Sequence, residues 1–178
     1  MTNHKLSAGQ KFPSLSVNKL DGGQIDFLNP KGDFDWLLVV VYRGQHCPKC
    51  TQYLTELNEL LPKFKEVGVG VVAMSADSEE QAHTQINKIN PSFDVGYDLT
   101  LDQMKTLGLY ISNPRSEAET DHPFAEPGLF VINESKQIQL IDISNAPFLR
   151  PDLMSVINGI GFIRDPEKNY PIRGTLDY

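Results

Sequence analysis

A seven-residue apolar run, WLLVVVY at positions 36–42, constrains the fold of this chain more than any other feature. It is rich in β-branched residues and far too short to span a bilayer. Continuous apolar runs of this length are typical of strands that are buried on both faces, as in parallel sheets. A second run of the same kind, VGVVAMSAD, occupies positions 69–77. The two runs predict the centre of a sheet that is covered on both faces.

The hydrophobic period changes soon after the first run. Apolar residues then recur at helical spacing, at Leu54, Leu57, Leu60, Leu61 and Phe64. They predict an amphipathic helix that leaves the end of the first strand, and Pro62 predicts that this helix is kinked or shortened. A second helix is predicted over 78–89, with Ser78 as its N-cap. A helix between two buried strands indicates an α/β fold.

Weaker patterns complete the predicted order. Hairpins are predicted from 14–19 with 24–28 and from 129–133 with 137–143, a short strand at 94–99, and helices at 101–107 and from Asp152 onward. Residues 112–127 contain three prolines and little periodicity, and they predict a long loop. The whole order predicts a three-layer α/β sandwich with a central mixed sheet.

Length and charge set further bounds. The 178 residues predict a single domain over 1–178. The formal net charge of −7 argues against a nucleic-acid or anionic-membrane partner. The first residues, MTNHKLSAGQKFPSLSV, lack the pattern of a secretory signal. A cytoplasmic, soluble protein is therefore expected.

Both cysteines of the chain lie in the segment YRGQHCPKC, at 42–50. In a reducing compartment, a C-x-x-C pair is more often catalytic or metal-binding than a structural disulfide. A helix N-terminus offers unpaired N–H donors and about half a positive charge, which lowers a thiol pKa from about 8.5 into the range of about 3.5–7.5. Cys47 is thus the candidate attacking thiol and the more exposed one, and Cys50, one turn deeper, the candidate resolving thiol.

Two neighbours, His46 and Arg43, are candidate supporting residues. His46 can add positive charge near the thiolate, and a solvent-facing loop position is the alternative. Lys49 can add charge too, but it is expected to be a solvated helix side chain. Arg43 can steady an anion at the site, and an exposed surface arginine is an equal alternative.

The segment VVVYRGQHCPKC resembles the AhpC/TSA (redoxin) family, whose fold is thioredoxin-like. EPGLFVI at 126–132 and NAPFLRPDLMSVINGIGFIRDPEKNYPIRGT at 145–175 resemble two further blocks of the same family, in the same order. The resemblance implies a thioredoxin-like sandwich. It also implies that Pro127 is a cis proline that packs beside the dithiol, an ordinary loop proline being the alternative.

The chain departs from the family pattern at several positions. His46 stands where the family usually has tryptophan, and an imidazole can titrate near neutral pH and bind metal. The P-x-x-x-T-x-x-C signature of true peroxiredoxins is missing, because Val40 and Gly44 stand at its proline and threonine positions. Arg43 and Arg150 are the candidates for the arginine that orients the peroxide in that family.

The resemblance and the dithiol together predict a thiol-based antioxidant enzyme, an oxidoreductase that reduces disulfides or peroxides through a Cys47–Cys50 disulfide. The reducing partner is expected to be a thioredoxin-type or glutathione-type thiol. No NAD, flavin or haem motif is visible, so no cofactor is expected. The sequence gives little basis for choosing between a peroxide and a disulfide as the substrate.

Two other classes of function stay open at this point. One is a non-catalytic copper- or zinc-binding protein, in which Cys47, Cys50, His46 and His122 would be the ligands. Against it, copper chaperones of the Sco type have C-x-x-x-C spacing, and His46 directly precedes Cys47. The other is a redox-inert interaction module, which the paired thiols at a helix start disfavour.

Overall fold

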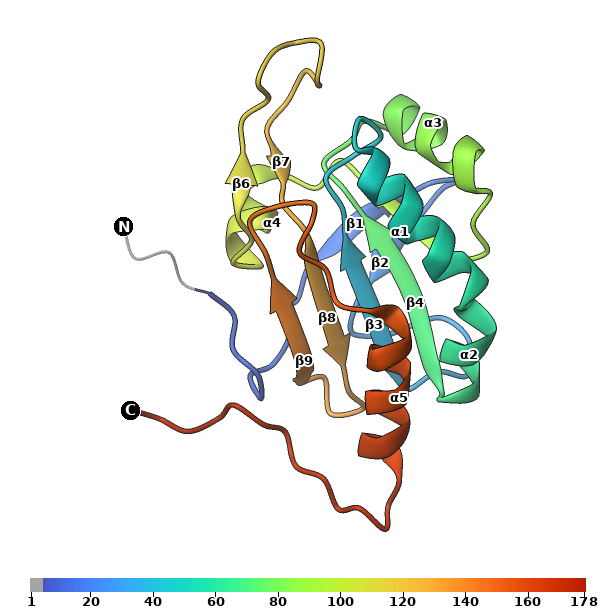
Figure 1. Cartoon of the computed structure of the whole chain (residues 1–178), viewed down its shortest axis with the longest axis vertical. Helices are drawn as coiled ribbons and strands as arrows, with labels where there is room; N and C mark the ends of the chain where they lie inside the picture. Colours follow the sequence, from blue (N-terminus) through green and yellow to red (C-terminus); the bar gives the residue numbers. More distant parts are fainter. Residues whose placement is uncertain (1–4) are drawn as a thin grey trace.

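The computed structural model describes residues 5–178 and is built around one seven-stranded sheet (Figure 1). Its strands, in spatial order, are β2 (Gln24–Asp26), β1 (Ser16–Lys19), β5 (Asp94–Tyr97), β4 (Val69–Met74), β3 (Trp36–Val41), β8 (Gly128–Ile132) and β9 (Ile138–Ile143). β3, β4 and β5 pair in parallel, and the remaining neighbours pair antiparallel. The predicted central mixed sheet is therefore confirmed.

Helices and the N-terminal segment cover the two faces of the sheet. The helices are α1 (Pro48–Glu59), α2 (Leu61–Glu66), α3 (Glu79–Ile89), α4 (Leu101–Thr106) and α5 (Leu153–Arg164). Side chains of α1, α2, α3 and α5 share one apolar cluster with the sheet, whereas α4 and the segment before β1 belong to a second cluster. The three-layer sandwich is confirmed. Within residues 5–178, none of the helices has the length and apolarity needed to cross a bilayer.

The position of β3 in the sheet explains why its sequence is apolar without interruption. Leu38 and Val40 belong to the cluster that contains α1, while Leu37 and Val39 belong to the opposite cluster. Successive side chains of a strand point to opposite faces, and here both faces are buried. The strand lies between β4 and β8, so its edges are paired as well. It is thus enclosed on both faces and both edges, and it is a rigid base for the loop and the helix that come after it.

The helix boundaries agree with the predicted signals. Ser78 caps α3 through a reciprocal pair of hydrogen bonds with Gln81. Asp152 accepts a hydrogen bond from the Ser155 N–H at the start of α5. α1 ends at Glu59 and α2 begins at Leu61, with Pro62 in its first turn, so the predicted interruption of the helix is confirmed.

The segment 112–127 differs from the predicted plain loop. β6 (Ile111–Ser112) and β7 (Phe124–Ala125) pair antiparallel and form a separate two-stranded sheet. Residues 113–123 connect them as an excursion that rises beyond the end of the main sheet, beside the start of α1 (Figure 1). Two-residue strands are too short to show a period-two pattern, which is why the sequence does not reveal them.

Substitution of Leu57 by alanine tests the core under α1. Leu57 is fully buried, so we expect the free energy of unfolding to fall by about 2–5 kcal/mol in urea denaturation. Leu101→Ala is the matched control, since Leu101 is 44% exposed and its truncation should cost less than about 0.5 kcal/mol. Equal losses for the two variants would show that α1 does not pack as described.

Candidate active site

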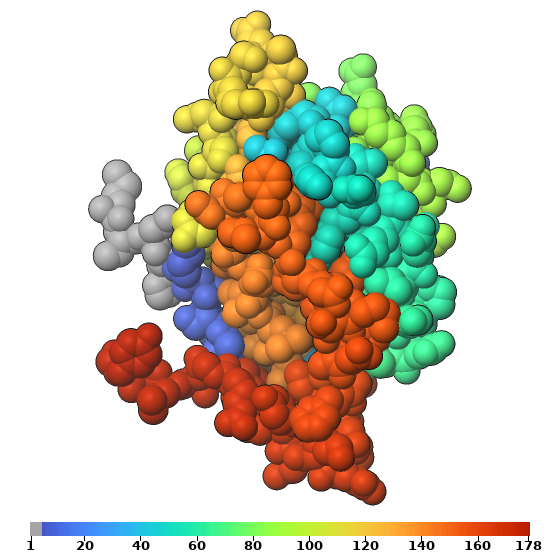
Figure 2. Space-filling view, viewed as in Figure 1, coloured from blue at the N-terminus to red at the C-terminus, as the bar shows by residue number. Residues whose placement is uncertain are grey.

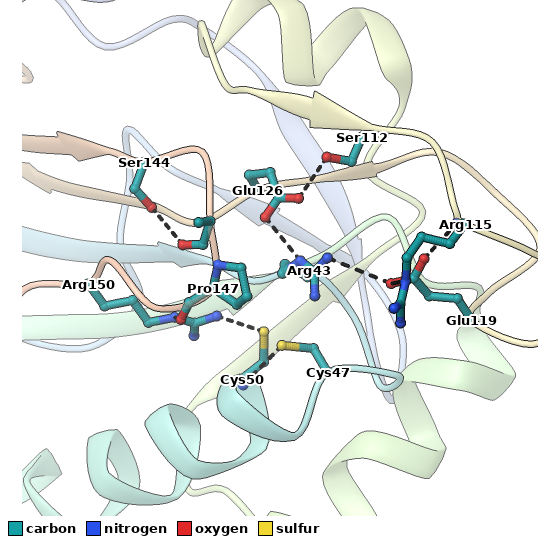
Figure 3. Close-up of polar contacts among 11 residues, drawn as sticks. Arg43, Cys47, Cys50, Ser112, Arg115, Glu119, Glu126, Ser144, Pro147 and Arg150 are labelled. Carbon is teal, nitrogen blue, oxygen red and sulfur yellow. Dashed lines mark hydrogen bonds and ion pairs between the residues drawn. The ribbon is translucent and has the colours of Figure 1, made fainter.

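Cys47 lies at the point where α1 begins. It is the N-cap of the helix, and its Sγ accepts a hydrogen bond from the Cys50 N–H at 3.3 Å. Pro48 occupies the first turn, where an N–H would have no helical hydrogen-bond partner, so its absence costs nothing. Both cysteines are free thiols, and Figure 3 shows their sulfur atoms side by side. The predicted placement of a dithiol at a helix start is confirmed.

Cys47 is the more exposed of the two thiols, as predicted, but both are buried: Cys47 is only 2% exposed and Cys50 is 0% exposed. The cause lies in two segments that are distant in sequence. In Figure 2 the orange segment after β9, residues 144–150, lies between the yellow excursion and the cyan start of α1. In Figure 3 Pro147 of this segment lies close to the two sulfur atoms. The thiols therefore lie beneath a cover.

The pKa of Cys47 is lowered to about 6. The largest cause is the hydrogen bond from the Cys50 thiol, and burial opposes it. The Cys50 N–H and the cations of Arg43 and Arg150 lower the pKa further. Burial raises the pKa of Cys50 far above its ordinary value. The two thiols therefore titrate as a coupled pair, and the negative charge left by the first proton rests on Cys47.

Arg43 supplies one cation beside Cys47. Its Nε lies 3.0 Å from Glu126 Oε2 and its Nη2 lies 3.8 Å from Glu119 Oε1 (Figure 3). The guanidinium also stacks on the Phe124 ring, at 4.7 Å from the centroid. Glu119 belongs to the excursion, and Glu126 directly follows β7. Arg43 is thus a fixed group next to the dithiol and not a free surface arginine.

Arg150 reaches the dithiol from the other side. Its Nη2 donates to Cys50 Sγ at 2.8 Å (Figure 3). The two residues are a hundred positions apart, and only the turn between β9 and α5 brings them together. The sequence makes Arg150 a candidate for the peroxide-orienting arginine, and in the structure it contacts Cys50, the candidate resolving thiol.

His46 does not act as the predicted source of positive charge. Burial, together with the nearby charge of Arg43, lowers the pKa of His46 to about 4, so the imidazole is neutral near pH 7. The ring packs against Phe124 with centroids 4.7 Å apart. The ring therefore fills an apolar position beside Phe124. Lys49 is exposed on α1, and the structure gives it no contact with the thiols.

Gly44 occupies the threonine position of the peroxiredoxin signature for a steric reason. Its φ is +144°, and an added Cβ would lie 2.5 Å from Asp77 Oδ1 and 3.0 Å from His46 Nδ1. Asp77 is fully buried, and its Oδ2 accepts a hydrogen bond from the Gln45 N–H at 2.8 Å. Asp77 thus holds the loop before Cys47 and leaves no space for threonine.

Asp77 was missed by the sequence analysis, although a signal was present. It ends the second apolar run, and the carboxyl ends of adjacent parallel strands meet at one edge of a sheet. Glu126 was also missed as a partner of Arg43. It directly precedes Pro127 and β8, so it reaches the same edge from the neighbouring strand.

The implied cis conformation of Pro127 is wrong for this structure. No cis peptide bond occurs among the described residues. Pro127 is buried between β7 and β8, where the chain continues in one direction. The Glu126 N–H donates to the Tyr110 carbonyl and the Pro127 carbonyl accepts from the Ser144 N–H, which fits an extended trans segment. The packing of Pro127 beside the dithiol stays a prediction.

The alternative of a metal site finds no support. Within residues 5–178, no group of three or more His, Cys, Asp or Glu side chains could hold a metal ion. His122 lies toward Asp77, with Nε2 at 3.8 Å from Asp77 Oδ1, and its Nδ1 pairs with Asp121 at 2.7 Å. The four residues that the sequence suggested as ligands do not converge.

Replacement of Gly44 by alanine tests the geometry of the loop. We expect a loss of stability of at least about 1–3 kcal/mol from the backbone conformation, increased by the contact with Asp77. Gly22→Ala is the control, because Gly22 also has positive φ but open space around it. Comparing the two variants by urea denaturation isolates the part of the stability loss that steric crowding causes. A loss no greater for Gly44→Ala than for Gly22→Ala would contradict the crowding.

The ionisation of Cys47 is testable by ultraviolet thiolate absorbance. We expect one thiolate to appear with a midpoint near pH 6, so that reaction with a small alkylating agent rises with pH and levels off above that value. Arg43→Gln removes a cation and should raise the pKa, whereas Arg173→Gln, in the exposed tail, should leave it unchanged. A midpoint near the ordinary thiol pKa in the native protein would refute the assignment.

Comparison with known proteins identifies relatives of this chain. The AhpC/TSA family model matches residues 8–141. The thiol-disulfide oxidoreductase ResA of Bacillus cereus is 30% identical over 111 residues, which cover 62% of this chain and 61% of that protein. The 1-Cys peroxiredoxin of Onchocerca volvulus is 23% identical over 145 residues, which cover 74% of this chain and 62% of that protein. The chain thus spans about three fifths of the length of these relatives.

Solved structures show the same fold. A variant of Peroxiredoxin 6 of Arenicola marina superposes with a TM-score of 0.76 at 18% identity, over 89% of this chain and 74% of that chain. Peroxidoxin BcpB of Mycobacterium tuberculosis gives a TM-score of 0.74 at 14% identity, over 91% and 100% of the two chains. The thioredoxin-like fold is therefore confirmed, and the match of the family model over most of the sequence shows that this chain belongs to the AhpC/TSA family.

Proposed function

We propose that this protein is a thiol oxidoreductase in which Cys47 and Cys50 cycle between a dithiol and a disulfide. The observation that carries the proposal is the Cys47 thiol at the N-cap of α1, with its pKa lowered to about 6 and a second thiol one turn away. A nucleophilic thiolate at neutral pH and an adjacent resolving thiol are what dithiol redox chemistry requires. The names of the relatives in both groups, thiol-disulfide oxidoreductase and peroxiredoxin, support the same chemistry.

With a peroxide as substrate, the first step forms a sulfenic acid on Cys47. The Cys47 thiolate attacks the terminal oxygen, an S–O bond forms, the O–O bond breaks, and the departing alkoxide takes a proton from solvent. Cys50 then attacks the Cys47 sulfur, the S–O bond breaks, and the hydroxide leaves as water with the Cys50 proton. The product is the Cys47–Cys50 disulfide.

With a disulfide as substrate, the first product is a mixed disulfide. The Cys47 thiolate attacks one sulfur of the substrate, and the other sulfur leaves as a thiolate. Cys50 then attacks Cys47, the mixed disulfide breaks, and the second substrate thiol is released. Both routes therefore end in the same internal disulfide, which a thioredoxin-type or glutathione-type thiol returns to the dithiol.

The burial of the site favours small oxidants. An in-line attack needs access to Cys47 Sγ, and this residue is 2% exposed. A low-molecular-weight peroxide or disulfide fits such a site better than the disulfide of a folded protein. We propose the cytoplasm as the compartment, since in a reducing compartment a C-x-x-C pair is more often catalytic than a structural disulfide.

A quenched-flow comparison of oxidants tests the function. Reduced protein is mixed with hydrogen peroxide, a small aromatic disulfide or insulin, and the products are identified by mass spectrometry. Mass spectrometry is preferred because Trp36, the only tryptophan, begins β3 at the end remote from Cys47. We expect either small oxidant to yield the internal disulfide at least about a hundredfold faster than denatured protein does, with insulin much slower.

Variants of the two cysteines assign the roles. Cys47→Ser should abolish the fast reaction, while Cys50→Ser should react at Cys47 and stop at the sulfenic acid or mixed disulfide. Exposed thiols of the denatured chain provide the reference rate. Retention of the fast reaction in Cys47→Ser, or a native rate equal to the denatured rate with every oxidant, would contradict the proposal.

A further inference from the structure

We propose that Arg150 is a catalytic residue that holds the negative charge of Cys50 when this thiol attacks or leaves. The inference rests on the proposed function and deepens it, because it assigns a cation to each of the two sulfur atoms. Arg43 stabilises negative charge on Cys47, and Arg150 stabilises negative charge on Cys50. The two steps concerned are closure of the internal disulfide and its reduction.

The contact itself is direct. Arg150 Nη2 lies 2.8 Å from Cys50 Sγ, and Figure 3 shows the guanidinium aimed at this sulfur from the side opposite Arg43. Charge-assisted hydrogen bonds from arginine are stronger than those between neutral groups. A donor of this kind stabilises a thiolate more than it stabilises a thiol. The bond therefore strengthens whenever Cys50 carries negative charge.

Cys50 needs such a partner more than Cys47 does. It is fully buried, and burial raises its pKa, whereas the charge of Arg150 lowers it. Cys47 also accepts the Cys50 N–H at the helix start, a donor that Cys50 cannot use for its own sulfur. Without a cation, a thiolate at Cys50 would be a poorly solvated charge in an apolar cluster.

The guanidinium is held in place before reaction. Its Nε donates to the Pro147 carbonyl at 3.1 Å, and its central carbon lies 5.2 Å from the centroid of the Tyr53 ring. The Tyr53 hydroxyl donates to the Pro151 carbonyl at 2.7 Å, which ties the segment that carries Arg150 to α1. A prepositioned cation needs little reorganisation when charge develops on sulfur.

The two arginines differ in how their charge is balanced. Arg43 is paired with the carboxylates of Glu126 and Glu119. No ion pair joins Arg150 to a carboxylate of any residue in the range 5–178. Its charge is therefore available to the sulfur.

In both steps negative charge develops on the Cys50 sulfur. In closure, Cys50 gives up its proton, its sulfur attacks Cys47 Sγ, and hydroxide or a substrate thiolate leaves with that proton. In reduction, a reductant thiolate attacks Cys47 Sγ, the S–S bond breaks, and Cys50 departs as a thiolate that is protonated afterwards. Arg150 stabilises the sulfur anion in each direction.

Arg150→Met tests the inference, with Arg150→Lys and Arg173→Met as comparisons. Using the small oxidant that reacts best, quenched flow separates oxidation of Cys47 from disulfide closure. We expect Arg150→Met to slow closure by about tenfold or more, and to move the rise of the closure rate to higher pH. At a pH well above the Cys47 midpoint, where this thiol stays ionised, its oxidation should change by less than about threefold. Arg150→Lys should restore part of the closure rate. Arg173→Met should behave as the unmodified protein.

A second measurement does not depend on turnover. In a Cys47→Ser background Cys50 is the only cysteine, so thiolate absorbance reports this sulfur alone. Adding Arg150→Met should raise its titration midpoint, and urea denaturation confirms that the variant is folded. An unchanged midpoint, or an unchanged closure rate, would overturn the role of Arg150. If the unmodified protein forms no internal disulfide, the proposed function fails, and the titration still decides whether Arg150 stabilises the Cys50 thiolate.

Discussion

The joint between β3 and α1 is the constraint on which the rest of the site depends. β3 is enclosed on both faces and both edges, so the chain that leaves it emerges at a fixed point. The loop before Cys47 is held by the Asp77 carboxylate and requires glycine at Gly44. These constraints place the Cys47 sulfur against the Cys50 N–H in the first turn of α1, which lowers the free energy of the thiolate.

Charge around the dithiol is arranged by segments that are remote in sequence. The excursion and the end of β7 bring Glu119 and Glu126 to Arg43, and the turn after β9 brings Arg150 to Cys50. These segments also cover the thiols, so the cations act on sulfur in a medium with little water. One arrangement therefore provides both the electrostatic asymmetry of the two thiols and the restriction to small oxidants that we propose.

The departures from the family pattern have local physical reasons. Threonine is absent at Gly44 because the Asp77 carboxylate occupies the space next to a backbone of positive φ. Histidine replaces tryptophan at His46 without adding charge, because the ring is packed on Phe124 and stays neutral. The site thus has an uncharged packed ring at one position and no side-chain hydroxyl at the other. Its cations are supplied by Arg43 and Arg150 instead.

The sequence by itself determined the order of the main elements, the mixed sheet and the placement of Cys47 and Cys50 at a helix start. These depend on local signals, namely the apolar run 36–42, the helical spacing after it and the position of Pro48. Tertiary structure alone decided the burial of Cys47, the trans bond before Pro127, the neutrality of His46 and the contact of Arg150 with Cys50. Each of these depends on which distant segment covers a residue, and exposure, hydrogen bonding and pKa are set by that cover and not by neighbours along the chain.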